Sequence, residues 1–150
     1  DTWPYKLSIE HKRCIIPSTG YFEPHYNPDG TKAPYYAHLP ETEIFSIGGL
    51  WSSWKDPDTG EDIESYTMIT IGANELMSQV HNGGNSPFRM PLIIDPNNVD
   101  RWLDPDLPDQ EIKTLFRKFP SERMEAYEVS KAMWSPRNMM DRRIIEKSAN

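Results

Sequence analysis

"YTMITIGANELMSQVHNGGNSPFRMPLII", residues 66 to 94, combines in one run the patterns that decide the fold. Residues 66 to 71 alternate as in a half-buried strand, and "NELMSQV" (74 to 80) follows with apolar residues at helical spacing and Asn74 in the N-cap position. A glycine-rich loop then leads into the apolar stretch "RMPLII". We therefore predict a strand, a short helix, a loop and a second strand, in that order.

His81 directly follows this predicted helix and has two interpretations. A helix C-terminus explains it, because histidine is favourable in the last turn and Gly83 or Gly84 can take the positive φ that ends a helix. A functional site also explains it, because the loop after His81 closes with Arg89. For the histidine considered alone, the structural explanation is the more common one.

Composition limits the classes of function. The chain has 150 residues, the size of one ordinary domain, and carries 16 Lys and Arg against 23 Asp and Glu, a net charge of -7. This charge excludes a global attraction to nucleic acid or to an anionic membrane, so any such contact must be local. The single cysteine excludes an internal disulfide, and no apolar run is long enough for a signal peptide or a membrane span. We expect a monomeric cytoplasmic protein without membrane contact.

The first half of the chain is strand-like. Short runs rich in β-branched and aromatic residues are separated by Pro and Gly, at 13 to 17, 20 to 23, 33 to 39 and 43 to 51. Residues 54 to 72 are typical of a hairpin, because the polar "DPDTGED" carries turn residues and an alternating run follows it.

The second half is more helical. Apolar residues recur at spacings of three and four in 95 to 103 and in 108 to 119, a last strand is predicted at 124 to 129, and the remainder has little periodicity. Strands first and helices later indicate an α+β fold with a bent, largely antiparallel sheet, a barrel-like core and flanking helices. We expect one domain over residues 1 to 150.

Several chemistries are disfavoured by the absence of their motifs. The sequence has no HExxH, no CxxC and no pair of histidines at i, i+4 spacing, so we expect no metal site. It has neither a G-x-S-x-G nucleophile elbow nor a phosphate-binding GxxxxGK[ST] loop, and we expect no cofactor. What remains is a set of polar residues at the ends of elements: Glu23, His81 and Arg89.

Glu23 follows "GYF" on a strand that should be half-buried, where a carboxylate is costly unless it is paired or used. The alternative is an exposed glutamate at the end of an edge strand, and the residues alone favour that alternative. Cys14 lies in the apolar run "RCIIP", where a buried structural thiol is more common than a nucleophile.

Several blocks taken together resemble the SOS response-associated peptidase (SRAP) family. "KRCIIPSTGYFEP" is similar to its strand pair "RRC-apolar-IP-A-x-G-F-Y-E-W", and "FSIGGLWSSW" to its "apolar-A-G-L-W-x-x-W" strand. "YTMITIGANELMSQVHN…RMPLII" resembles the stretch that ends "I-H-x-R-M-P", and "RWLDP" and "YEVSKAM…RN" resemble later segments of the family. The blocks occur in the family's order along nearly the whole chain.

The resemblance implies a function and residues that perform it. Members of the family capture abasic sites in single-stranded DNA: the aldehyde of the opened sugar reacts with an N-terminal cysteine to form a thiazolidine cross-link. A glutamate and a histidine of the matching blocks belong to the active site and correspond to Glu23 and His81. The resemblance places Arg89, Lys131 and Asn138 in contact with the DNA.

The sequence departs from the family pattern in three places. The chain begins with Asp1 rather than the catalytic cysteine and lacks the family's "N-A-R-x-E" segment, so we expect it to represent the larger C-terminal part of the domain. The loop between His81 and Arg89 is longer than usual, and Pro24 replaces a tryptophan. Two alternatives to an abasic-site cross-linking protein stay open: a non-catalytic remnant that binds single-stranded DNA, and a thiol peptidase that removes its own leading residues.

Overall fold

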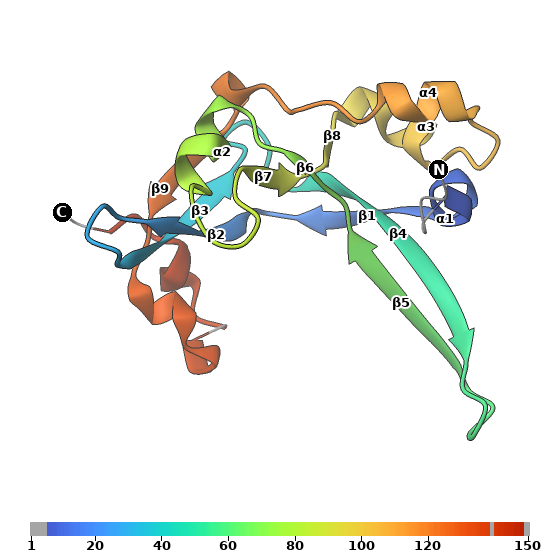
Figure 1. Ribbon diagram of the computed structural model, residues 1–150, viewed down its shortest axis with the longest axis horizontal. Helices are drawn as coiled ribbons and strands as arrows, with labels where there is room; N and C mark the ends of the chain where they lie inside the picture. The colour runs from blue at the N-terminus through green and yellow to red at the C-terminus, as the bar shows by residue number, and fades with distance from the viewer. Residues whose placement is uncertain (1–5, 139, 149–150) are drawn as a thin grey trace. The chain divides into compact units, whose positions relative to one another are not determined.

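The computed structural model describes residues 6–138 and 140–148, which form a mixed α+β structure with antiparallel sheets (Figure 1). This confirms the predicted fold class, although the sheets of the described residues do not close into a barrel. The elements, in chain order with η for 3-10 helices, are α1 (Lys6–His11), β1 (Arg13–Ser18), β2 (Tyr21–Tyr26), β3 (Lys32–His38), β4 (Phe45–Lys55), β5 (Asp62–Met68), β6 (Thr70–Gly72), α2 (Glu75–Val80), β7 (Arg89–Pro91), β8 (Ile93–Ile94), η1 (Pro96–Asn98), α3 (Val99–Leu103), α4 (Asp109–Thr114), η2 (Ser121–Arg123), β9 (Glu125–Glu128), η3 (Lys131–Trp134), η4 (Pro136–Asn138) and η5 (Arg142–Ile145).

The chain divides into two compact units, each made of three segments. Unit 1 contains residues 1–17, 45–71 and 91–119, and unit 2 contains residues 18–44, 72–90 and 120–150. Each unit therefore brings together parts of the chain that are far apart in sequence.

Unit 1 is built on the sheet β1-β4-β5, with the short β8 also paired to β4. Strands β4 and β5 form a long antiparallel hairpin whose tip extends away from α3 and α4 (Figure 1). Trp51 and Tyr66 are paired across this hairpin, and the side chains of β5 are exposed along its whole length. The predicted hairpin is confirmed, and its first arm is the continuous strand β4 rather than a separate segment that begins at residue 54.

The core of unit 1 surrounds Trp102, which is fully buried. Its indole Nε1 donates to the Cys14 carbonyl oxygen at 2.8 Å, so burial leaves this polar atom satisfied. Arg13, also buried, donates from Nε to the Trp102 carbonyl oxygen at 2.7 Å and from its other nitrogens to carbonyl groups that include Asp104. The apolar residues of this core are Leu92, Ile94, Leu107, Ile112 and Leu115.

Unit 2 is built on the antiparallel sheet β2-β3-β9. Because side chains alternate along a strand, Tyr21, Glu23 and His25 share one face of β2, whereas Phe22 lies on the other face with its partner Tyr36. Helix α2 covers the first face, since His25 Nδ1 lies 3.0 Å from the Gln79 carbonyl oxygen (Figure 1). The two faces therefore have separate environments.

Three details differ from the sequence-based expectations. The helix expected over 108 to 119 ends at Thr114, because Leu115 and the residues after it fold into tight turns, with the Arg117 amide bonded to the Leu115 carbonyl. The described residues after 129, namely 130–138 and 140–148, form three short 3-10 helices. Helix α1 was not predicted, because it is short and carries few apolar residues.

No helix among the described residues is long and apolar enough to cross a membrane.

Candidate active site

Glu23 lies in the middle of β2, opposite Tyr35 of β3. The strand alternation directs its side chain to the face that α2 covers, where 20% of the side chain is exposed. Glu23 is therefore not the exposed glutamate at the end of an edge strand that the sequence left open. A carboxylate in this position needs a partner or a use.

His81 ends helix α2 and occupies its C-cap position, with its backbone N–H donating to the Met77 carbonyl oxygen. Asn74 caps the other end as predicted, because its Oδ1 accepts from the Met77 amide at 2.9 Å. The structural explanation for His81 is therefore correct for its backbone. Gly83 does not end the helix, and only Gly84 of the two loop glycines has a positive φ.

The imidazole of His81 is oriented by the backbone of Arg89. Its Nδ1 atom lies 3.1 Å from the Arg89 carbonyl oxygen and 3.3 Å from the Arg89 amide nitrogen. A protonated Nδ1 donates to the carbonyl, and an unprotonated Nδ1 accepts from the amide. Either contact holds the ring in the same place, with Nε2 4.0 Å from Glu23 Oε2.

Glu23 and His81 thus form a pair that is close but not hydrogen-bonded. Their side chains are 20% and 15% exposed, and 4.0 Å between Oε2 and Nε2 exceeds the length of a hydrogen bond. A reacting group that approaches the pair could exchange protons with both atoms, since a general acid or base needs a contact of about 3 Å with its substrate rather than with its neighbour.

Burial raises the pKa of the Glu23 carboxyl above its ordinary value, and the positive charges of His81 and Arg89 offset part of this rise. The loss of hydration therefore outweighs the attraction of the two nearby basic groups. A carboxyl with a raised pKa keeps its proton to higher pH than an ordinary carboxyl, which favours Glu23 as a proton donor.

Arg89 completes a group of three that we call the Glu–His–Arg cluster: Glu23, His81 and Arg89. The Nε atom of Arg89 donates to the Ser86 carbonyl oxygen at 3.1 Å, so the loop that leads to Arg89 also orients the Arg89 guanidinium. All three members belong to unit 2. The structure therefore brings together the three polar residues that the sequence singled out at the ends of elements.

The loop between His81 and Arg89, residues 82–88, is held against strand β2. Asn82 Oδ1 accepts from the Tyr26 amide at 2.8 Å, and Asn82 Nδ2 donates to the Tyr26 carbonyl oxygen at 3.0 Å. Gly83 lies so close to the Tyr26 ring that an added Cβ would be 2.5 Å from Cδ2. The Asn82 side chain thus satisfies the backbone N–H and C=O of Tyr26 as a neighbouring strand would. Gly83 allows the loop to pass close to the Tyr26 ring.

Lys131 and Asn138 lie elsewhere in unit 2. Lys131 begins η3, and its charge acts on Asp29 in the β2–β3 turn, whose pKa is lowered chiefly by hydrogen bonds from Thr31. Asn138 lines a hollow of about 420 Å³ together with Arg143 and Lys147, and its Nδ2 donates to the Ala132 carbonyl oxygen. The structure does not bring these two predicted DNA-binding residues into the Glu–His–Arg cluster.

Two features of the site were not predicted. The anchoring role of Asn82 leaves no trace in the sequence, because its partner Tyr26 is 56 positions away. Tyr21 shares the face of Glu23, and its buried hydroxyl has no hydrogen-bond partner within residues 6–138 and 140–148. Burial, and then the charge of Glu23, raises the pKa of Tyr21, so the phenol stays protonated beside the carboxyl. The strand alternation could have placed Tyr21 on this face.

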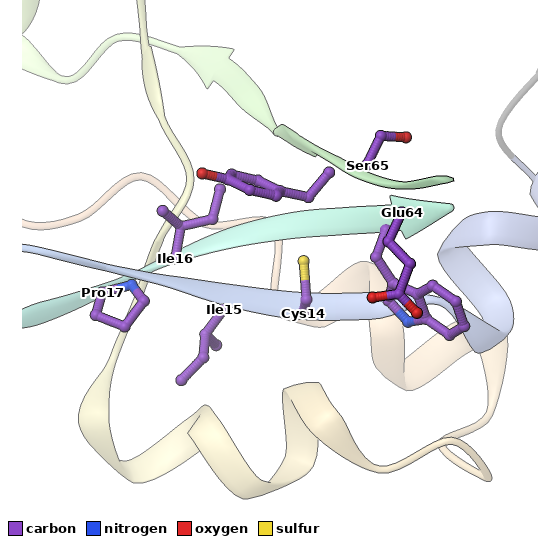
Figure 2. Close-up of a pocket in the computed structure, with 8 residues that line it drawn as sticks. Cys14, Ile15, Ile16, Pro17, Glu64 and Ser65 are labelled. Carbon is purple, nitrogen blue, oxygen red and sulfur yellow. The ribbon is translucent and has the colours of Figure 1, made fainter. Parts of the chain in front are cut away.

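A second hollow lies in unit 1, beside strand β1 (Figure 2). It measures about 780 Å³, and its lining includes Cys14, Ile16, Trp51, Glu64 and Tyr66. Figure 2 shows Cys14 and Ile16 on one side of β1 and Ile15 on the other. Burial raises the pKa of the Cys14 thiol, which lowers its thiolate fraction and its reactivity as a nucleophile.

Within the described part of the chain, no group of three or more His, Cys, Asp or Glu residues could hold a metal ion. The Glu–His–Arg cluster offers one carboxylate and one imidazole, together with a guanidinium that repels cations. Its arrangement suits proton transfer beside an anionic ligand.

Comparisons with known proteins all point to one family. The sequence model of the SOS response associated peptidase (SRAP) family matches residues 2–136. The chain is 33% identical to the abasic site processing protein YoqW of Bacillus subtilis (strain 168) over 135 residues, which cover 89% of this chain and 57% of YoqW. It is 28% identical to the abasic site processing protein HMCES of Gallus gallus, covering 87% of this chain and 42% of HMCES.

A solved structure agrees with these sequence relatives. The X-ray structure of a protein from Bacteroides thetaiotaomicron matches 99% of this chain with a TM-score of 0.90 at 34% identity, and this match covers 62% of that protein. The chain thus spans less than two thirds of the length of each of these relatives.

Proposed function

Because the chain belongs to the SOS response associated peptidase family, we propose that it processes abasic sites in single-stranded DNA. Relatives at 28% and 33% identity are named abasic site processing proteins. The observation that supports the proposal is the largely buried Glu23–His81 pair, with 4.0 Å between Oε2 and Nε2 and the charge of Arg89 acting on the carboxyl. An abasic sugar needs proton transfers to open, and its phosphates need a cation.

The reaction that we propose is capture of the sugar aldehyde by an amine and a thiol of one cysteine. The amine adds to the aldehyde carbon and one water leaves, which gives an imine. The thiol then adds to the imine carbon, and its proton goes to the nitrogen as the thiazolidine ring closes. In the family pattern this cysteine is N-terminal, and the residues of this chain supply the proton transfers.

Glu23 and His81 have complementary parts in these steps. The Glu23 carboxyl, whose pKa is raised by burial, donates a proton to the departing hydroxyl so that it leaves as water. The His81 Nε2 atom faces the same space and takes the proton that the incoming amine or thiol releases. Arg89 holds a phosphate next to the opened sugar, as a guanidinium can with two parallel hydrogen bonds.

The proposal is tested with the chain itself and free cysteine as the amino-thiol. Single-stranded DNA with one abasic site is incubated with limiting cysteine, and thiazolidine formation is followed by mass spectrometry with and without the protein. We expect the protein to accelerate the reaction. Glu23→Gln and His81→Ala should each lower the protein-dependent rate about 10²-fold, the usual scale for a general acid or base.

A matched control lies on the opposite face of the same sheet. His38 Nε2 is 3.5 Å from Glu125 Oε2, so Glu125→Gln and His38→Ala remove a similar pair outside the site and should leave the rate unchanged. DNA binding without acceleration would favour the non-catalytic single-stranded DNA-binding alternative. If the protein neither binds the DNA nor accelerates the reaction, the proposed function is refuted.

A further inference from the structure

Phe88, the residue before Arg89, has an unusual backbone. Its φ is 60°, and within residues 6–138 and 140–148 it is the only non-glycine residue with a positive φ. A bulky side chain in this left-handed region is costly, because its Cβ crowds the neighbouring carbonyl group. The side chain is also 52% exposed, so the strain does not serve to bury an apolar surface in the core.

The surrounding backbone imposes this conformation. The Phe88 amide donates to the His81 carbonyl oxygen at 2.8 Å, and the Phe88 carbonyl accepts from the Ala73 amide at 2.8 Å. The other end of the loop is fixed to Tyr26 through Asn82. Phe88 is therefore an aromatic residue on a loop held at both ends rather than on a free tip.

The position of Phe88 connects it to the Glu–His–Arg cluster. Its backbone bonds to His81, and the next residue, Arg89, orients the His81 ring. Strained residues that their surroundings hold in place occur preferentially at ligand-binding sites. An exposed aromatic ring with a cation as its neighbour is the arrangement that proteins use to bind single-stranded nucleic acid, since the ring stacks on a base and the cation contacts the backbone.

We propose that Phe88 is a stacking platform for the base next to the abasic position. This inference rests on the proposed function and adds a binding residue to it. A nucleotide beside an abasic site has lost one stacking neighbour, so one face of its base is open to an aromatic ring. Because every base has such a face, Phe88 contributes affinity for the lesion without selecting the neighbouring sequence.

The test uses the 150-residue chain and single-stranded DNA with a tetrahydrofuran abasic analogue. 2-Aminopurine is placed on the 5′ or the 3′ side of the analogue, and its fluorescence reports stacking while anisotropy gives the dissociation constant. We expect the wild-type protein to quench 2-aminopurine on one side. Phe88→Leu should abolish this quenching and weaken binding roughly 5- to 100-fold, the range that base–aromatic stacking supplies.

The variants keep the backbone strain constant, because leucine and tryptophan meet the same positive φ as phenylalanine. Phe88→Trp should retain the quenching and the affinity. Trp54→Ala removes an aromatic side chain of unit 1 that is 56% exposed and should change neither quantity. The slope of log affinity against log salt should stay the same in Phe88→Leu, since stacking releases no counterions.

Two results would overturn the inference, and they can be told apart. If the wild-type chain binds, and Phe88→Leu shows the same affinity and the same quenching, the stacking role is rejected and the proposed function stays intact. No binding of abasic single-stranded DNA by the wild-type chain would reject both.

Discussion

Gly83→Ala should detach the 82–88 loop from strand β2 and disable the site without unfolding the protein. The new Cβ would lie 2.5 Å from Tyr26 Cδ2 and 2.6 Å from Cγ, atoms close to the backbone that can move away only if the ring changes rotamer or the strand shifts. Overpacking of this kind costs about 1–3 kcal/mol. Release of the loop would instead break the two Asn82–Tyr26 hydrogen bonds, worth about 1 kcal/mol each, so the total loss is limited to about 2 kcal/mol.

Urea unfolding measures this loss. With a slope of about 2 kcal/mol per molar urea for a protein of this size, the midpoint should fall by about 1 M. The cysteine-dependent rate should fall further than the stability does, because residues 82–88 connect His81 to Arg89. Gly30→Ala is the control for the rate: Gly30 has a φ of 83° and nothing lies within 4 Å of an added Cβ, so this variant loses some stability through backbone strain but should keep the wild-type rate. A Gly83→Ala protein with wild-type stability and rate would refute the packing argument.

Two further outcomes are expected. The raised pKa of Glu23 means that its protonated form stabilises the fold fully below the ordinary carboxyl pKa, and that this stabilisation is lost as the pH rises through the folded-state pKa. Glu23→Gln, which cannot ionise, should therefore have a higher urea midpoint than wild type at pH 7 and lose this advantage near pH 4; equal midpoints at pH 7 would contradict the burial effect. Arg89→Ala should flatten the dependence of log affinity on log salt for single-stranded DNA by roughly 0.7 for one lost phosphate contact, whereas an unchanged slope would remove Arg89 from the interface.

Local patterns in the sequence predicted the elements that carry the site. Strand alternation and a capping residue are local signals, and they correctly indicated the strand with Glu23, the helix that begins after Asn74 and the hairpin over β4 and β5. The family resemblance carried by several blocks is confirmed by the match over residues 2–136. Exclusion of other motifs singled out Glu23, His81 and Arg89, and the family resemblance suggested their roles. The structure places the three residues together, and their roles stay predictions.

The remaining features depend on contacts between distant residues. The pairing of Asn82 with Tyr26 and the orientation of His81 by a backbone carbonyl involve groups that carry no periodic signal. The end of the helix at Thr114 follows from turns after it that its apolar spacing does not reveal. The resemblance suggested Lys131 and Asn138 as DNA-binding residues, and this stays a prediction: Lys131 begins η3, whereas Asn138 ends η4 and lines a hollow with Arg143.

The distribution of charge explains how an acidic chain could hold a site for DNA. Unit 1 carries 13 Asp and Glu against 8 Lys and Arg, whereas unit 2, which contains the whole Glu–His–Arg cluster, carries 10 against 8. Within unit 2, residues 130–148 have five Lys and Arg and two acidic residues, one of which, Asp141, is paired with Arg143 at 2.7 Å. Screening limits the reach of exposed charges to about 10 Å at 0.1 M salt, so the charges close to a bound strand decide its affinity rather than the net charge. Affinity should therefore respond strongly to the loss of Arg89, whatever the net charge of the chain.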